Sequence, residues 1–159
     1  MRKVSVAMTL FVVVLGAFMV GTAGAGSKKP VTLDGAVNAH GSKDVSKKSS
    51  ASLEIELYDF YLEPTYVKVK PGEKLTLALK NSGKAQHTFT SDALGVDKQL
   101  APGQSMKIKV TIPSSGGTTQ FHCRFHESMG MQGAFYTKVG VTASNTPTTK
   151  SSSSSGSGY

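Results

Sequence analysis

Apolar and polar residues alternate along the middle of the chain with the period of two that is typical of half-buried β-strands. The clearest alternation lies in residues 53–57, 75–80 and 106–112. Shorter runs predict further strands at residues 66–70, 87–91, 118–123 and 134–141, separated by turns rich in Gly, Pro, Asn and Ser. No long segment has the 3.6-residue period of an amphipathic helix. The pattern therefore predicts an all-β fold, an antiparallel Greek-key β-sandwich of about seven to eight strands.

Composition divides the chain into four parts. Residues 1–25 have the form of a secretory signal peptide, because Arg2 and Lys3 precede an apolar run that ends in small residues at Ala25. A retained membrane anchor is the alternative interpretation. Residues 26–50 are predicted to be a flexible basic linker, residues 51–142 the folded domain, and residues 143–159 a disordered Ser/Gly-rich tail. We expect an exported protein, periplasmic or extracellular, whose domain folds without either flank.

The chain has a formal net charge of +8, and much of the excess lies outside the predicted domain. Residues 26–50 hold five lysines against two aspartates, whereas residues 51–142 hold ten basic and eight acidic side chains. Because nucleic-acid binding needs a basic face on the domain itself, we expect no nucleic-acid partner. The basic linker would allow peripheral association with an anionic membrane or cell wall, although a solvated tether is the simpler interpretation.

The candidate chemistry is concentrated around Cys123, the only cysteine of the chain. A lone thiol in an exported protein is reactive, pairs between chains or binds a metal. His126 and Met131 follow Cys123 on one loop, and His87 lies upstream at the start of a predicted strand. A thiolate, two imidazoles and a thioether suit a type 1 (blue) copper site, in which His₂Cys is roughly trigonal and a methionine binds weakly along the axis. Zinc would gain nothing from the thioether, so we predict one copper ion, Cu(I) or Cu(II), with these four residues as ligands.

The spacing of this loop resembles that of the plastocyanin-like cupredoxins, which are small blue-copper proteins. Their copper loop reads Cys, two residues, His, four residues, Met, one residue and Gly, and the chain places Cys123, His126, Met131 and Gly133 at those positions. The turn at residues 81–83 that precedes the upstream histidine is also similar. The resemblance covers residues 53–142 and implies the cupredoxin-like sandwich.

The family's Met-x-Gly pattern implies Met131 as the axial ligand, with Met129 as the alternative at the spacing of a shorter copper loop. The resemblance also implies that His126 is the more exposed imidazole and the electron port. Phe125 and Met129 would then form a docking patch around it. His122 adjoins the cysteine on a strand and is expected to point to the opposite face. His40 lies in the predicted linker and is expected to be solvated.

From these residues we expect a monomeric one-electron carrier between redox protein partners. A copper-handling protein, which sequesters or delivers copper without redox turnover, is the alternative, because it would use the same ligands. The sequence contains no Ser-His-Asp arrangement, paired carboxylates or phosphate-binding glycine loop, so we do not expect an enzyme.

Overall fold

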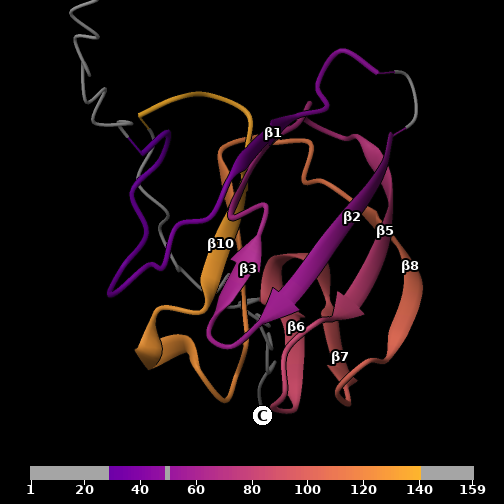
Figure 1. The fold of residues 1–159 in the computed structure, drawn as a ribbon. Coiled ribbons are helices and arrows are strands. Elements are labelled where there is room, and N and C mark those ends of the chain that lie inside the picture. Colours follow the sequence, from indigo (N-terminus) through magenta and orange to yellow (C-terminus); the bar gives the residue numbers. More distant parts are fainter. Residues whose placement is uncertain (1–28, 49–50, 141–159) are drawn as a thin grey trace, which may run out of the picture.

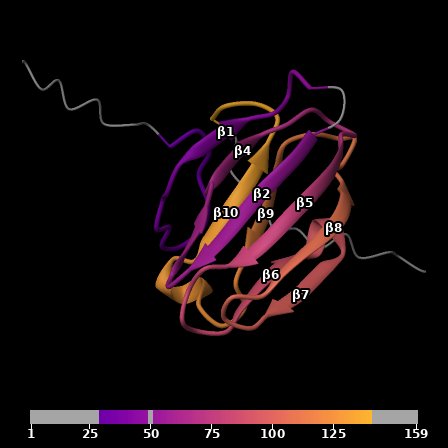
Figure 2. The same ribbon diagram turned by 45° about the vertical axis from the view of Figure 1, so that its right-hand side comes forward.

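Ten strands form within residues 29–48 and 51–140, the parts of the chain that the computed structural model describes. They are β1 (Ser42–Asp44), β2 (Ala51–Tyr58), β3 (Tyr61–Glu63), β4 (Tyr66–Lys68), β5 (Lys74–Asn81), β6 (His87–Ser91), β7 (Val96–Leu100), β8 (Ser105–Thr111), β9 (Thr118–His122) and β10 (Gln132–Tyr136). Two short 3₁₀ turns are also present, η1 (Asp92–Leu94) and η2 (Glu127–Met129). One sheet has the order β1-β4-β10-β9-β6-β7 and the other the order β3-β2-β5-β8. The two sheets lie face to face as a sandwich (Figures 1 and 2).

The predicted β-sandwich is confirmed, but its strand pairing is mixed rather than wholly antiparallel. β2 pairs in parallel with β5, and β4 pairs in parallel with both β1 and β10. The strands outnumber the expected seven to eight because β1, β3 and β7 show no readable alternation. β1 and β3 are three residues long, and the middle of β7 is exposed. Such strands owe their pairing to the rest of the fold rather than to an amphipathic pattern.

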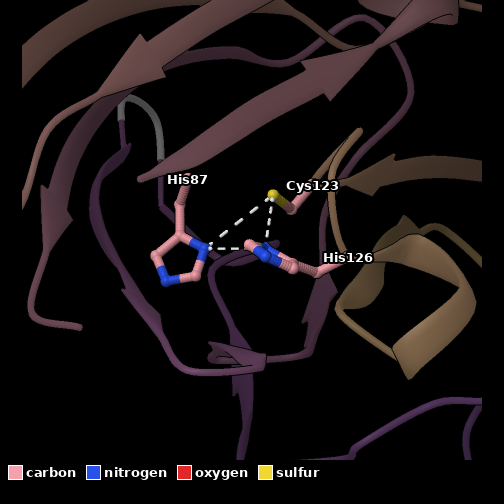
Figure 3. Close-up of side chains that lie close together, drawn as sticks. All are labelled: His87, Cys123 and His126. Atoms are coloured by element: carbon pink, nitrogen blue, oxygen red, sulfur yellow. Dashed lines mark hydrogen bonds between the residues drawn. The ribbon is translucent and has the colours of Figure 1, made fainter. Parts of the chain in front are cut away.

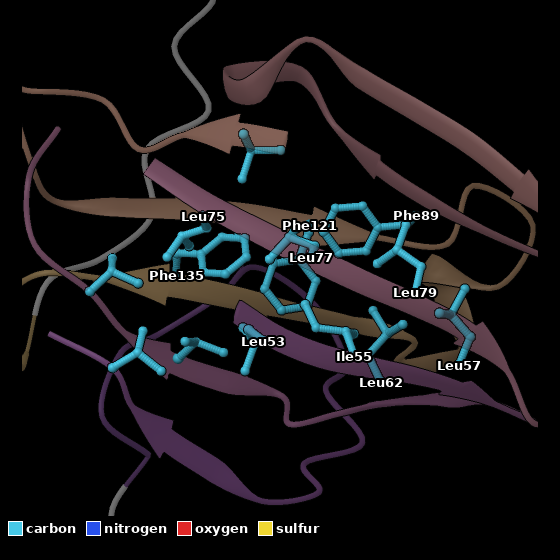
Figure 4. Close-up of a cluster of buried hydrophobic side chains, with 14 of the residues drawn as sticks. Leu53, Ile55, Leu57, Leu62, Leu75, Leu77, Leu79, Phe89, Phe121 and Phe135 are labelled. Atoms are coloured by element: carbon cyan, nitrogen blue, oxygen red, sulfur yellow. The ribbon is translucent and has the colours of Figure 1, made fainter. Parts of the chain in front are cut away.

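In the core between the sheets, aliphatic side chains of the four-stranded sheet pack against three phenylalanine rings of the six-stranded sheet, which also contributes Val67 and Leu100 (Figure 4). Along β2, alternate residues from Ala51 to Leu57 are buried, while Glu54 between them is exposed. Phe89, Phe121 and Phe135 face them from the six-stranded sheet, and the Phe121 ring centroid lies 5.2 and 4.9 Å from the other two. Burial of each such side chain contributes about 1.5–3 kcal/mol. The core therefore fixes β6, β9 and β10, whose ends adjoin the candidate metal centre.

The prediction that residues 26–50 form a flexible linker is wrong for residues 29–48. β1 joins the six-stranded sheet, and Val45 lies in the main core with 1% of its surface exposed. Val31 and Leu33 are buried in a second cluster with side chains of β4 and β10. These few apolar anchors are spaced without a period among Lys, Ser, Gly and Asp, so composition alone hides them. The folded domain therefore begins near residue 30 rather than at residue 51.

Two parts of the predicted organisation lie outside the described residues: the signal peptide at residues 1–25 and the tail at residues 143–159. Among the residues that are described, no helix has the length and hydropathy needed to cross a membrane.

Candidate metal centre

Three of the predicted ligands converge at one end of the sandwich (Figure 3). His87 begins β6, Cys123 follows β9 directly, and His126 precedes η2. The two imidazole Nδ1 atoms lie 3.2 Å apart, and Cys123 Sγ lies 3.8 Å from Nδ1 of His87 and 3.4 Å from Nδ1 of His126. Within residues 29–48 and 51–140, this is the only group of three or more His, Cys, Asp or Glu residues whose ligand atoms all lie within 4.8 Å of one another.

The spacing of the three donor atoms fits a single metal ion. Bonds of about 2.0 Å to nitrogen and about 2.3 Å to sulfur in a trigonal plane would separate two nitrogens by about 3.5 Å, and nitrogen from sulfur by about 3.7 Å. The observed separations of 3.2, 3.4 and 3.8 Å differ from these values by about 0.3 Å or less. A thiolate and two imidazoles at this distance form a soft donor set that suits copper or zinc.

The loop from Cys123 to Met131 is closed by backbone hydrogen bonds. The Cys123 N–H donates to the Met131 carbonyl at 3.0 Å, and the N–H groups of His126 and Met131 donate to the carbonyls of Cys123 and His126 at 3.0 and 3.1 Å. η2 then ends at Gly130, whose φ of 91° lies in the left-handed region that favours glycine. These bonds fix His126 and Met131 relative to each other and to Cys123 at the end of β9.

Close packing explains why Gly133, the glycine of the Met-x-Gly pattern, is a glycine. A Cβ at Gly133 would clash with the Thr65 carbonyl and would lie 2.6 Å from the Phe121 ring. Only glycine lets β10 lie this close both to the Thr65 carbonyl, directly before β4, and to the Phe121 ring of β9.

The two candidate axial methionines differ in their exposure to solvent. Met131 has no exposed surface and belongs to the same core cluster as Cys123. Met129 is 49% exposed on the loop surface. A thioether that binds a buried metal must itself point inward, so the burial favours Met131. The axial role of Met131 stays a prediction.

The thiol of Cys123 is fully buried and accepts a hydrogen bond from the backbone N–H of Thr88 at 3.3 Å. The Thr88 hydroxyl in turn accepts the N–H of Arg124 at 2.8 Å. The start of β6 is thus tied to both the cysteine and the residue after it. A backbone N–H donor of this kind orients a metal-binding sulfur.

His87 has a charged partner on the side away from the sulfur. Its Nε2 lies 2.7 Å from Oδ1 of Asp59, which was not among the predicted site residues. The Lys84 N–H, the His87 imidazole and the Ala85 N–H, in that order, lower the pKa of Asp59 to about 2. An aspartate in a turn is common, so no sequence pattern could have separated Asp59 from other turn residues.

His126 is half-buried, and desolvation together with the nearby His87 imidazole lowers its pKa. A lowered pKa favours the neutral imidazole, which keeps a lone pair for a metal. Its ring packs against Phe60 at 4.6 Å and lies 6.2 Å from the Phe125 ring, measured between centroids. Phe125 and Met129 are 46% and 49% exposed, so two apolar side chains of the loop reach solvent near this histidine.

The other histidines lie outside the group. His122 is half-buried with its Nε2 3.8 Å from Glu127, in agreement with the strand alternation. His40 is exposed as expected, but it is not part of a free tether, because its ring stacks on Tyr61 with centroids 3.6 Å apart.

The family model of the cupredoxin-like domain matches residues 14–135, and the chain belongs to this family. The resemblance to plastocyanin-like cupredoxins is thereby confirmed, and membership implies copper as the metal. A stretch of 51 residues is 39% identical to the copper-resistant cuproprotein CopI of Pseudomonas aeruginosa, and it covers 32% of this chain and 28% of CopI. The structure is also similar to dithionite-reduced auracyanin of Roseiflexus castenholzii, with a TM-score of 0.47 and 21% identity over 61% of this chain and 100% of auracyanin.

Proposed function

We propose that this protein is an exported type 1 copper protein that carries one electron at a time between redox partners. It would bind one copper ion through His87, Cys123 and His126, with Met131 as the weak axial ligand. The convergence of two Nδ1 atoms and one Sγ within 3.8 Å of one another supports this proposal most strongly. Bound copper would supply a one-electron couple between Cu(I) and Cu(II).

The surroundings of the donor atoms suit electron transfer. Cys123 and His87 are fully buried, and backbone hydrogen bonds close the loop that carries the other donors. Donors held in this way rearrange little between oxidation states. The proposed role is therefore that of a carrier rather than an enzyme.

Exchange of electrons would take place at the loop surface. His126 is the half-buried imidazole of the pair, and Phe125 and Met129 expose apolar surface beside it. An apolar surface of this kind suits brief docking of larger redox proteins, the proposed donor and acceptor. The monomeric state belongs to the same proposal, because self-association through this surface would cover the port.

Export and surface association remain part of the proposal as well. The lysines of residues 29–48 (Lys29, Lys43, Lys47 and Lys48) are exposed on a folded segment rather than on a free linker. They could favour peripheral contact with an anionic membrane or cell wall.

Copper handling without redox turnover is the second candidate. The 39% identity to the copper-resistant cuproprotein CopI over 51 residues favours it. The same three donors would bind Cu(I) tightly, since soft thiolate ligands select this ion.

The experiment begins with the purified mature protein and Cu(II). An intense visible band from thiolate-to-copper charge transfer is expected, and a colourless complex would count against a type 1 site. Reversible voltammetry with fast self-exchange would then support the carrier. Slow self-exchange together with transfer of Cu(I) to a copper-free acceptor protein would support the handling role instead.

A further inference from the structure

Asp59 reaches the candidate metal centre from the opposite sheet. It lies in the turn between β2 and β3, whereas His87, its partner, begins β6 in the six-stranded sheet. The contact of 2.7 Å between Asp59 Oδ1 and His87 Nε2 joins residues 28 positions apart. We infer that Asp59 is a positioning residue, which fixes the orientation and tautomer of His87 and favours Cu(II) over Cu(I). This inference rests on the proposed copper site.

The loop before His87 is shaped around the Asp59 carboxylate. The backbone N–H groups of Lys84 and Ala85 donate to its two oxygens at 2.9 and 3.2 Å. A Cβ at Gly83 would clash with the carboxylate and would lie 2.8 Å from His87 Nε2. The two N–H groups and the His87 imidazole surround the Asp59 carboxylate, and Gly83 leaves room for it because it has no side chain. A solvent-exposed ion pair formed by chance would not require the loop to adapt in this way.

The contact determines which imidazole nitrogen faces the other ligands. A neutral imidazole carries its proton on one nitrogen, and an ionised carboxylate only accepts hydrogen bonds. The proton of His87 therefore lies on Nε2, where it is donated to Asp59. The lone pair of Nδ1 is then left to point toward Cys123 Sγ and His126 Nδ1, which lie 3.8 and 3.2 Å from it. This is the orientation that a ligand nitrogen needs. Partners of this kind set the ring orientation and raise the basicity of metal-binding histidines.

The charge of Asp59 has a second effect. A carboxylate behind the imidazole stabilises the oxidised site more than the reduced one, because the oxidised site carries one more positive charge. Removal of this charge should lower the ratio of Cu(II) affinity to Cu(I) affinity about tenfold. For a one-electron couple this corresponds to a rise of about 59 mV in the reduction potential. Loss of the hydrogen bond as well should weaken copper binding by about 10- to 100-fold.

Two variants of the full mature chain separate these effects. Asp59→Asn keeps an acceptor oxygen but removes the charge, and Asp59→Ala removes both. Asp97→Asn is the matched control. Asp97 accepts a hydrogen bond from Arg124, which follows Cys123 on the ligand loop, at 2.9 Å, but it touches no imidazole of the site. The measurements are the ¹⁵N spectrum of the His87 ring in the copper-free protein, the Cu(I) affinity by competition, and the reduction potential.

We expect the Nε2–H tautomer of His87 in the wild type and Asp59→Asn, and its loss in Asp59→Ala. The potential should rise in Asp59→Asn and stay unchanged in Asp97→Asn. An Nδ1–H tautomer in the wild type, or equal shifts in Asp59→Asn and Asp97→Asn, would overturn the inference. If Asp59→Ala does not fold, the potential of Asp59→Asn still decides.

Failure of the proposed function is recognisable separately. A wild-type protein that gives no visible copper band, yet shows the Nε2–H tautomer and loses it in Asp59→Ala, would refute the type 1 site while supporting the positioning of His87. If the wild type gives the band but the Asp59 variants have the same tautomer and potential as Asp97→Asn, the positioning role alone would be refuted.

Discussion

Asn38 holds the turn that carries Gly130, although the two residues lie far apart in the sequence. The Asn38 N–H donates to the Gly130 carbonyl at 2.9 Å, and its side-chain amide donates to the carbonyls of Met129 and Phe60 at 2.8 and 3.0 Å. A Cβ at Gly130 would lie 3.0 Å from the Asn38 side chain. The segment before β1 is therefore part of the scaffold of the loop between His126 and Met131.

The first prediction concerns the packing of this segment. Val31→Ala should lower the free energy of unfolding of the copper-free protein by about 2 kcal/mol, because the lost methyl groups are buried with 1% exposure. Val139→Ala is the matched control, since Val139 is 69% exposed and its change should stay within about 0.5 kcal/mol. Chemical denaturation measures both. Equal stabilities would mean that residues 29–48 do not pack on the sandwich in solution.

The second prediction concerns the turn itself. Asn38→Ala removes two side-chain hydrogen bonds, each worth about 0.5–1.5 kcal/mol. Hydrogen exchange at the Met129 and Gly130 amides, which close η2, should become faster than in the wild type. Asn38→Asp should behave in the same way, because a carboxylate cannot donate to the two carbonyls. Protection of these amides in either variant would show that η2 does not depend on the N-terminal segment.

These contacts indicate what the sequence could and could not predict. β2 and β5 have one buried face and β8 has a partly buried one, so the alternation of their residues was readable. β1 has three exposed residues, and its parallel pairing with β4 depends on a distant strand. An amphipathic pattern records burial of an element, not the choice of its partner.

The same distinction applies to the site. Cys123, His126 and Met131 lie on one loop, so their spacing was visible in the chain. Asp59 and Asn38 act through contacts across 28 and 91 residues, with polar side chains that are ordinary in turns and loops. Only the packing of the two sheets brings these residues to the ligand loop.

The third prediction tests the sulfur ligand against its strand neighbour. Cys123→Ser should abolish the visible band of the Cu(II) protein, because the band requires a thiolate donor. His122→Ala should retain it, since His122 contacts Glu127 and lies outside the group of three. Absorption spectra of the two variants at equal copper loading give the answer. A colourless His122→Ala protein would mean that β9 presents the other face to the metal.

The fourth prediction concerns pH. The Ser82 hydroxyl, followed by Tyr58 and Lys80, lowers the pKa of Glu56 below its ordinary value of 4.5. A lowered folded-state pKa means that the stabilising contribution is present above about pH 4.5 and is lost as the pH falls through the folded-state value. The copper-free wild type should therefore be more stable than Glu56→Gln at pH 7, by about 1 kcal/mol.

This difference should shrink as the pH is lowered below 4.5. Denaturation of both proteins at several pH values measures it. Glu54→Gln, a change at an exposed position on the same strand, should alter the stability at pH 7 by no more than about 0.5 kcal/mol. A gap between wild type and Glu56→Gln that is constant with pH would refute the role assigned to the carboxylate.

The fifth prediction distinguishes the two methionines of the loop. An axial thioether binds copper weakly, so its replacement should change the reduction potential rather than remove the metal. Met131→Leu should raise the potential, because leucine removes a donor that favours Cu(II) and leaves the site more apolar. Met131→Gln should lower it, since an amide oxygen is a harder donor.

The same two substitutions at Met129 provide the matched control. Because Met129 is 49% exposed, its replacement should affect the docking of partners, with little change in spectrum or potential. Voltammetry and absorption spectra of all four variants decide between the two positions. A large shift at Met129 with none at Met131 would transfer the axial role to Met129, and it would require η2 to turn that side chain inward when copper binds.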